Sequence, residues 1–199
     1  MDSDAWNGRY ATDELVWRAE PNRFLVEAVE GLTPGRALDV ACGEGRNAVW
    51  LASRGWKVVG VDFSSVALAK ARRMAEDRGA DVEWVEADVV SWIPLRGVFD
   101  LVAVMYLHVP ADQRRQVLAN AAAALAPGGV LLVVGHDATN PAEGFGGPQD
   151  PAVLYSAQDV VCDLGGLRIE RAERVERPVD TEPGPAVALD ALVRAVRPA

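Results

Sequence analysis

The sequence has few of the residues that build disulfide-stabilised or metal-binding proteins. Among 199 residues there are two cysteines, Cys42 and Cys162, and two histidines, His108 and His136. Neither cysteine belongs to a Cys-x-x-Cys motif or to a Cys/His cluster, the patterns that indicate disulfide frameworks and zinc sites. We therefore expect no structural disulfide and no bound metal.

Long apolar segments and an excess of positive charge are also missing. No apolar run approaches the ~20 residues that a membrane-spanning helix needs, and the first ten residues lack the basic and apolar regions of a signal peptide. Lys and Arg number 20 against 29 Asp and Glu, so the net charge is -9. Because so acidic a surface repels phosphate backbones and anionic lipid, we expect a cytoplasmic protein that binds neither nucleic acid nor membranes.

The composition that remains is that of an ordinary globular protein, with 50% hydrophobic and 25% charged residues. The length suits a single domain over residues 1–199. Apolar runs alternate with segments of helical spacing, which predicts β-α-β units and a parallel sheet covered on both faces. The expected strands are 36–41, 57–61, 82–85, 99–105 and 130–134. The expected helices are one that opens at Pro21, one over 48–52, one over 66–78 and one over 112–125.

The pattern changes after Val134. Residues 136–150 are rich in Gly, Pro and Asn, which predicts a long loop, and we expect a substrate-side loop over 136–155. A helix is expected over 156–164. Residues 167–179 and 187–196 are expected to be two final strands, although the spacing of Ile169, Ala172 and Val175 also fits a helix.

The strongest motif is ALDVACGEGRNAVWLA, residues 37–52. A buried strand leads into Gly43-x-Gly45 and then directly into a helix, whose first N–H groups have no partner in the helix. The motif alone fits a plain strand-to-helix turn equally well. However, Asp62 and Asp88 close the second and third strands, and a carboxylate after the second strand suits the hydroxyls of a ribose. Together these residues predict a nucleoside-containing ligand.

With these motifs the chain resembles a class I S-adenosylmethionine-dependent methyltransferase, of the small-molecule type that includes the tellurite-resistance methyltransferases. The matching segments are LDVACGEGRNA (38–48), VVGVDFS (58–64), VEADV (85–89), FDLVAVMYLHV (99–109) and LAPGGVLLVV (125–134). The resemblance implies a doubly wound, Rossmann-like α/β fold with a seven-stranded sheet, mostly parallel with an antiparallel last strand. The sequence departs from the family at Ala41, where glycine is usual.

The resemblance also implies which residues bind S-adenosylmethionine and its product, S-adenosylhomocysteine. Asp39 and the loop Gly43–Gly45 would hold the methionine end, and Asp62 the ribose. Phe63 and Val89 would flank the adenine, Asp88 would contact its amino group, and Met105 would lie beside the sulfonium. The resemblance further places Cys42, Asn47, Ser64 and Ala87 among the cofactor-binding residues.

Residues 1–20 are expected to form a lid that orders when cofactor binds, because Trp6, Tyr10 and Trp17 are too many aromatics for a solvated tail. Trp6, Arg9 and Tyr10 resemble the W-x-x-R-Y segment that closes over the cofactor in relatives of this kind. Arg9 or Arg46 would pair with the cofactor carboxylate. The alternative for the aromatics is a simple anchor that docks a tail on the core.

His108 and His136 are expected to line the pocket of the methyl acceptor, because both follow predicted strands at the edge where α/β proteins bind ligands. Their role would be to position the acceptor or to act as a base. The alternative is that both make only local backbone contacts. The acceptor is expected to be a small molecule that carries a thiol, an amine, a hydroxyl or a chalcogen oxyanion.

Two other functions fit parts of the sequence. GEGRNA (residues 43–48) nearly satisfies the G-x-G-x-x-A fingerprint of an NAD(P)-binding oxidoreductase, but there is no second domain and no Tyr-x-x-x-Lys pair. A non-catalytic, adenosylmethionine-binding regulatory module would keep the same glycine and acidic residues.

Overall fold

The computed structural model describes residues 3–12, 14–182 and 184–199, and its centre is a seven-stranded sheet with the order β3-β2-β1-β4-β5-β7-β6. Every strand except β7 runs parallel to the others, and β7 is antiparallel to both of its neighbours. The strands are β1 (Arg36–Val40), β2 (Lys57–Asp62), β3 (Val82–Glu86), β4 (Phe99–Met105), β5 (Leu125–His136), β6 (Arg168–Asp180) and β7 (Pro185–Val196). This confirms the predicted fold class.

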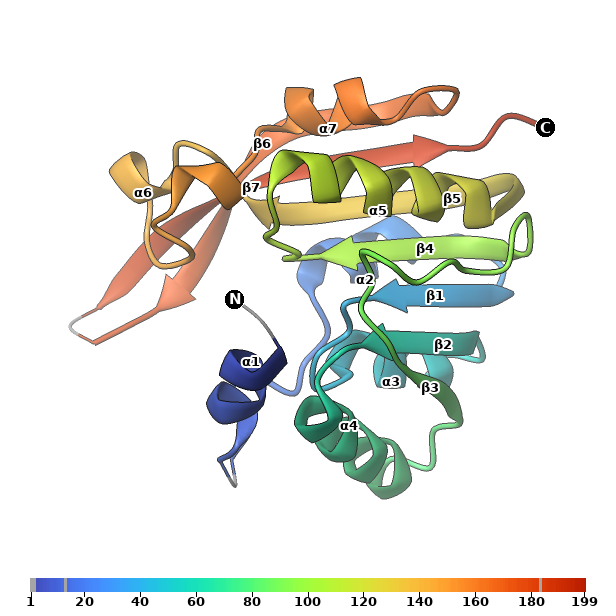
Figure 1. Ribbon diagram of the computed structural model, residues 1–199, viewed down its shortest axis with the longest axis horizontal. Helices are drawn as coiled ribbons and strands as arrows, with labels where there is room; N and C mark the ends of the chain where they lie inside the picture. Colours follow the sequence, from blue (N-terminus) through green and yellow to red (C-terminus); the bar gives the residue numbers. More distant parts are fainter. Residues whose placement is uncertain (1–2, 13, 183) are drawn as a thin grey trace.

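Helices cover both faces of the sheet (Figure 1). They are α1 (Ser3–Tyr10), α2 (Arg23–Val29), α3 (Arg46–Ser53), α4 (Ser65–Asp77), α5 (Ala111–Ala124), α6 (Asn140–Glu143) and α7 (Ala157–Asp163). One core lies between the sheet and α5 and α7, where Leu118 and Val160 are fully or nearly fully buried. The second core lies on the opposite face, where Leu25 of α2 and Leu51 of α3 are fully buried.

The central elements agree with the sequence predictions. β4 has the predicted bounds, and the helices over 66–78 and 112–125 are α4 and α5, shifted by one residue. The two doubtful C-terminal segments are strands, and they form an antiparallel hairpin. The helical alternative for residues 169–175 is therefore wrong.

Three local predictions need correction. The helix expected to open at Pro21 begins at Arg23, because Asn22 is its N-cap and accepts a hydrogen bond from the Phe24 amide. β5 begins at Leu125, five residues before the expected strand, and its pairing with β4 is irregular between Leu125 and Val130. The expected loop 136–150 contains the short helix α6.

The carboxyl ends of the parallel strands meet at one edge of the sheet, on the left in Figure 1. Beyond Asp190, where the pairing with β5 stops, β7 continues toward Pro185 with β6 as its partner. This hairpin arm projects past the sheet on one side of the edge, and α1 lies on the other side (Figure 1). In the part of the chain that the structure describes, no helix is long and apolar enough to cross a membrane.

Candidate functional site

The glycine loop Ala41–Gly45 connects β1 to α3 at this edge. Three of its residues have positive φ, namely Ala41 at 56°, Gly43 at 53° and Gly45 at 78°. A Cβ atom on Gly45 would lie 2.5 Å from the Trp84 ring and 2.7 Å from the Ala71 Cβ. Gly45 is therefore required both by its backbone conformation and by the close packing of β3 and α4 against the loop.

Asp39 lies in β1, directly before this loop, and is 1% exposed. Both of its carboxylate oxygens are buried without a hydrogen-bond partner. Burial raises the pKa of Asp39 to about 7, although the nearby Ala48 amide and Arg46 guanidinium act in the opposite direction. An unpaired buried carboxylate is unfavourable for folding, so this group has the properties of a binding site for a donor or a cation.

Asp62 ends β2 and connects two loops of the edge. Its Oδ2 accepts from the Gly43 amide at 2.8 Å, and its Oδ1 accepts from the Ser64 amide at 2.9 Å. Burial raises the pKa of Asp62, while these amides lower it. Phe63 is half-buried beside it, and the buried Ser64 is the N-cap of α4. Each carboxylate oxygen keeps acceptor capacity for a ligand hydroxyl.

The ends of β3 and β4 complete this row. The Ala87 amide donates to the Asp62 carbonyl at 3.0 Å, which holds the third loop beside the second. Asp88 is exposed and accepts from the Val90 amide, whereas Val89 is buried. Met105 is buried at the end of β4. The predicted cofactor residues of four strands thus lie along one edge.

Two of the predicted residues have internal roles in the fold. The Asn47 Oδ1 accepts from the Asn22 amide at 2.9 Å and so anchors the start of α2 to α3. Cys42 is buried, and burial raises the pKa of its thiol well above the ordinary value. Its side chain is therefore a neutral thiol within the glycine loop. Among the described residues no group of three His, Cys, Asp or Glu side chains is arranged to hold a metal ion.

The N-terminal segment lies over the glycine loop. Tyr10 is 5% exposed, and a Cβ atom placed on Gly43 would be 3.0 Å from the Tyr10 hydroxyl oxygen. Trp6 stacks on Tyr10 at 5.4 Å, and the Arg9 guanidinium lies 5.1 Å from each of the Trp6 and Trp17 rings. Arg9 is thus held between two indoles, while Arg46 is the arginine near Asp39. Met1, Asp2 and Asp13 of the predicted lid lie outside the described residues.

A buried ion pair that the sequence reasoning missed fastens this segment. Lys70 of α4 and Glu44 of the glycine loop are 2.9 Å apart, with side-chain exposures of 5% and 3%. The Glu44 carboxylate also accepts from the Val16 and Trp17 amides, each at 3.0 Å. Lys70 donates to the Glu14 carbonyl at 2.6 Å. We call Glu44 and Lys70 the clasp, because the two side chains join the glycine loop, α4 and the N-terminal segment.

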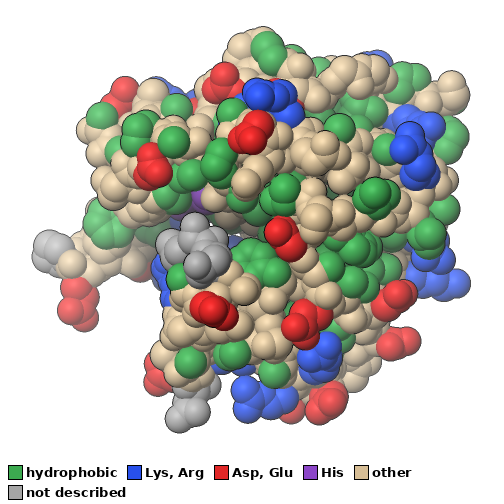
Figure 2. Space-filling view, in the orientation of Figure 1, with side chains coloured by type: hydrophobic (Ala, Val, Ile, Leu, Met, Phe, Trp, Pro, Cys, Tyr) green, Lys and Arg blue, Asp and Glu red, His purple; other side chains and the backbone are tan. Residues whose placement is uncertain are grey.

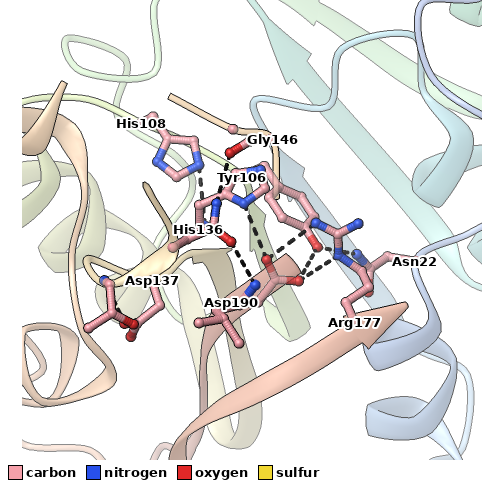
Figure 3. A network of polar contacts seen from close by, with 12 residues as sticks. Asn22, Tyr106, His108, His136, Asp137, Gly146, Arg177 and Asp190 are labelled. Atoms are coloured by element: carbon pink, nitrogen blue, oxygen red, sulfur yellow. Dashed lines mark hydrogen bonds and ion pairs between the residues drawn. The ribbon is translucent and has the colours of Figure 1, made fainter. Parts of the chain in front are cut away.

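The two histidines lie together, as the sequence analysis expected, with ring centroids 5.4 Å apart (Figure 3). The His108 Nε2 lies 3.4 Å from the His136 amide, and its Nδ1 lies 3.3 Å from the Val153 carbonyl. Burial lowers the pKa of His108 to about 4. His108 therefore contacts backbone groups of two distant segments, and one of these contacts supports His136.

Asp190 of β7 is the centre of a polar network beside His136, and the sequence analysis did not single it out. Asp190 is fully buried, and its Oδ2 accepts from the Tyr106 hydroxyl at 2.7 Å and from the Arg177 Nε at 2.6 Å. The His136 Nδ1 lies 3.5 Å from the Asp190 Oδ1. Figure 3 shows these side chains converging from β5, β6, β7 and the turn after β4.

The substrate-side loop packs against this network. Asn140 is fully buried, and its side chain accepts from the Leu189 amide at 2.7 Å and donates to the Gly146 carbonyl at 2.8 Å. A Cβ atom on Gly147 would be 2.7 Å from the His136 ring. The loop is therefore held close to the imidazole at the edge of the sheet.

Comparisons with known proteins show which proteins this chain resembles. Residues 37–129 match the family model described as a methyltransferase domain. The demethylmenaquinone methyltransferase of Thermus thermophilus is 37% identical over 123 residues, which are 61% of this chain and 54% of that protein. The ribosomal RNA small subunit methyltransferase C of Alcanivorax borkumensis is 34% identical over 128 residues, which are 59% of this chain and 38% of that protein.

The chain thus spans about half of these relatives' length or less. Among solved structures, the N-methyltransferase NodS from Bradyrhizobium japonicum, in complex with S-adenosylhomocysteine, matches with a TM-score of 0.75 at 20% identity. The match covers 99% of this chain and 98% of that one. Residues 37–129 thus match a methyltransferase domain in sequence, and the chain shares its fold with this solved structure.

Proposed function

We propose that the protein transfers a methyl group from S-adenosylmethionine to a small-molecule acceptor. The observation that carries this proposal is Asp39, whose buried carboxylate has no partner beneath a glycine loop. A cofactor that brings an ammonium group and a sulfonium to this edge would offset the unfavourable charge. The carboxylate of Asp62, at the end of the neighbouring strand, suits the ribose hydroxyls of the same ligand.

In this proposal, different residues of the edge bind different parts of the cofactor. Asp39, Arg46 and the glycine loop bind the methionine end, with Cys42 and Asn47 shaping the loop. Asp62 binds the ribose beside Phe63 and Ser64. Ala87, Asp88 and Val89 enclose the adenine, and Met105 packs beside the sulfonium. When bound, the cofactor supplies an electrophilic methyl group, and the protein contributes proximity and orientation.

Trp6, Arg9 and Tyr10 close over the cofactor as part of a lid, in our proposal. Tyr10 lies above Gly43, so its ring must shift or stack on the ligand when the methionine end binds. The clasp fixes residues 14–17 to the glycine loop. α1 would therefore move while residues 14–17 stay attached to the glycine loop. When the lid is closed, water would be excluded from the reacting atoms.

The acceptor would bind between the cofactor and the substrate-side loop, next to His136 and His108. A relative of this chain is named for demethylmenaquinone, a small molecule, and another is named for ribosomal RNA. The net charge of -9 favours a small molecule over a polyanion. NAD(P)-dependent oxidoreduction and non-catalytic binding are the alternatives that the experiments below test.

Calorimetry with S-adenosylmethionine, S-adenosylhomocysteine and NAD tests the cofactor. We expect micromolar binding of the first two and no comparable binding of NAD. Asp62→Asn should weaken binding by at least roughly tenfold, because a charge-assisted hydrogen bond contributes about 1.5–3 kcal/mol. Asp88→Asn is the matched control at an exposed position, with a smaller expected effect. Binding of NAD without adenosylmethionine would overturn the proposal.

A screen with methyl-labelled cofactor tests the reaction. The acceptors are a thiol, an amine, a phenol, a chalcogen oxyanion and a ribosomal RNA fragment. Label transfer to any of the small molecules supports the proposal. Transfer to the RNA alone would mean that the acceptor is a nucleic acid and not a small molecule. Tight cofactor binding without any transfer would favour the regulatory module.

A further inference from the structure

We propose that His136 is the general base of the reaction, that Asp190 is its positioning residue, and that the acceptor is a weakly acidic hydroxyl or thiol that must lose its proton. This inference rests on the proposed methyl transfer and goes further by naming a chemical class of acceptor. It depends on the arrangement of His136, Asp190 and His108, which is visible in Figure 3.

His136 and Asp190 face each other because of the sheet register. His136 is the last residue of β5, and the antiparallel pairing of β5 with β7 places it directly opposite Asp190. The His136 Nδ1 is 3.5 Å from the Asp190 Oδ1 and has no closer hydrogen bond among the described residues. Hydrogen bonds of catalytic groups are often long without substrate and shorten in the complex.

Asp190 is held so that one oxygen remains directed at the imidazole. The Tyr106 hydroxyl and the Arg177 Nε both donate to Oδ2, whereas Oδ1 receives only a long contact of 3.4 Å from the second Arg177 nitrogen. With both strong donors on Oδ2, the Oδ1 atom keeps the capacity to accept a hydrogen bond from the imidazole. It therefore selects the His136 tautomer that carries its proton on Nδ1 and its lone pair on Nε2.

His108 has no nitrogen left for catalysis. Its Nε2 faces the backbone N–H of His136 and must accept, so its Nδ1 must carry the proton and donate to the Val153 carbonyl. The ring stacks on His136 and on Tyr155, with centroids 5.4 and 5.8 Å away. His108 is thus a neutral support that fixes the backbone and ring of His136.

The Nε2 atom of His136 is the free nitrogen of the pair. No described residue makes a hydrogen bond to it, and the His136 side chain is 14% exposed. In Figure 2 a histidine side chain is visible inside the hollow on this face. The Tyr106 ring lies 5.3 Å from the His136 ring, and Tyr106 is the residue that follows Met105, the last residue of β4.

The surroundings of His136 favour its neutral form, chiefly because the imidazole is buried. Burial lowers the pKa of His136, the carboxylate of Asp190 on β7 raises it, and the guanidinium of Arg177 on β6 lowers it further. The neighbouring Tyr106, His108 and Tyr155 carry no charge, since burial raises the pKa of both tyrosines and lowers that of His108. A neutral imidazole next to a carboxylate is suited to accept a proton.

The proposed step balances as follows. The heteroatom of the acceptor X–H forms a bond to the methyl carbon, and the bond from that carbon to the cofactor sulfur breaks with its electron pair on sulfur. The proton of X–H passes to the His136 Nε2, and Asp190 stabilises the imidazolium until the proton leaves to water. A carboxylate or chalcogen oxyanion is already ionised and gains nothing from this base.

Acceptor pairs that differ in acidity test the assignment. Phenol is compared with 4-nitrophenol, which is much more acidic, using labelled cofactor. His136→Asn keeps a donor toward Asp190 but has no base. We expect it to lower kcat/KM for phenol by about 10²–10⁴-fold, to affect 4-nitrophenolate much less, and to leave adenosylhomocysteine affinity unchanged. The rise of kcat/KM for phenol with pH should also be absent in His136→Asn.

Equal losses on both phenols would reduce His136 to a positioning residue and overturn the proposal, as would transfer to oxyanions alone. If the wild-type protein does not bind the cofactor at all, the proposed function itself is contradicted.

A second readout needs no acceptor. In His108→Gln the chain has one histidine, and nitrogen NMR of the cofactor-saturated, folded protein reports its tautomer and pKa. We expect the proton of His136 on Nδ1. We also expect the pKa of His136 to be lower when the substitution Asp190→Asn is added. The opposite tautomer, or an unchanged pKa, would overturn the proposal.

Discussion

At the scale of single residues, Asp39 shows a conflict between stability and binding. Its carboxylate is 1% exposed and both oxygens lack hydrogen bonds. Because burial raises its pKa to about 7 from the ordinary 3.8, the native state holds a proton that the unfolded chain releases. The contribution of Asp39 to stability is therefore present at acid pH and is lost as the pH rises through about 7.

We predict that Asp39→Asn stabilises the ligand-free protein by about 2 kcal/mol more at about pH 8 than at about pH 5. The amide removes a buried charge that forms only at the higher pH. The same substitution should weaken adenosylmethionine binding, since the carboxylate no longer faces the cationic ligand. Urea unfolding at both pH values and calorimetry measure the two effects. A pH-independent change in stability would show that Asp39 is not the titrating group.

Gly45 and Gly31 form a matched pair, because both have φ close to +79° but only one is crowded. A Cβ atom on Gly45 would meet Trp84 and Ala71, whereas one on Gly31 would meet nothing within 4 Å. Alanine at either position costs about 1–2 kcal/mol in backbone strain. We predict that Gly45→Ala destabilises by roughly 2 kcal/mol more than Gly31→Ala, because of overpacking. Equal unfolding midpoints in urea would mean that Trp84 moves aside freely.

At the scale of elements, the clasp decides how the N-terminal segment is attached. Lys70 and Glu44 are buried, and Glu44 receives the Val16 and Trp17 amides. A second ion pair to the same segment, between Arg18 and Asp180 at the tip of the hairpin arm, is exposed at 69% and 83%. Exposed pairs contribute about 0–1 kcal/mol, and removing one partner of a buried pair costs far more.

We therefore predict that Lys70→Gln accelerates hydrogen exchange at the Val16 and Trp17 amides and weakens cofactor binding. Arg18→Gln, the matched control, should change neither. In the wild-type protein, adenosylhomocysteine should slow exchange in α1 if the segment is a lid. The clasp would lose its role if both variants exchanged alike, and exchange in α1 that ignores the ligand would contradict the lid.

The elements that the sequence predicts correctly are those whose burial follows a period. β4 is buried almost throughout as a continuous apolar run, and α4 buries one face at helical spacing. α1 was not predicted as a helix, because it has no apolar stripe and one buried residue, Tyr10. Its position depends on contacts with α4, such as the hydrogen bond of 2.7 Å between Ser64 and Asn7. Contacts of this kind join residues far apart in the sequence, and periodicity does not record them.

The same distinction applies to the site. The residues along the edge could be predicted because a glycine loop and strand-end carboxylates leave local signals. Asp190, Arg177 and the clasp could not, since each depends on the register of β7 or on packing between distant segments. An aspartate inside a C-terminal apolar strand, in DALV (residues 190–193), was the one available signal. A buried charge in such a strand needs partners.

At the scale of the whole molecule, the chain order matches the proposed division of labour. The cofactor residues lie between Trp6 and Met105, and the acceptor residues begin with Tyr106 and end with Asp190. Both sets reach the same edge because β4, the last strand of the first set, pairs with β5, the first strand of the second. Changes in the C-terminal part should therefore alter the acceptor while leaving cofactor binding intact.

The charge of the whole molecule also limits the acceptor. The net charge is -9, and the one arginine-rich segment, β6, is neutralised within the fold. Arg168 pairs with Glu170, Arg171 with Glu27 and Glu173, Arg174 with Glu143, and Arg177 with Asp190. Each of these arginines is paired with a carboxylate, and a phosphate backbone would have to displace that carboxylate.

We accordingly predict no saturable binding of a ribosomal RNA hairpin at about 0.15 M salt, with or without adenosylhomocysteine. Fluorescence anisotropy at two salt concentrations measures this. A charge-reversing variant of β6, Glu170→Lys with Glu173→Lys, frees Arg168 and weakens the hold on Arg171. It serves as the control, which should bind RNA weakly and release it as salt rises. Tight binding by the wild-type protein, with an affinity that falls steeply with salt, would mean that phosphate contacts outweigh the acidic surface. The acceptor would then have to be sought among nucleic acids.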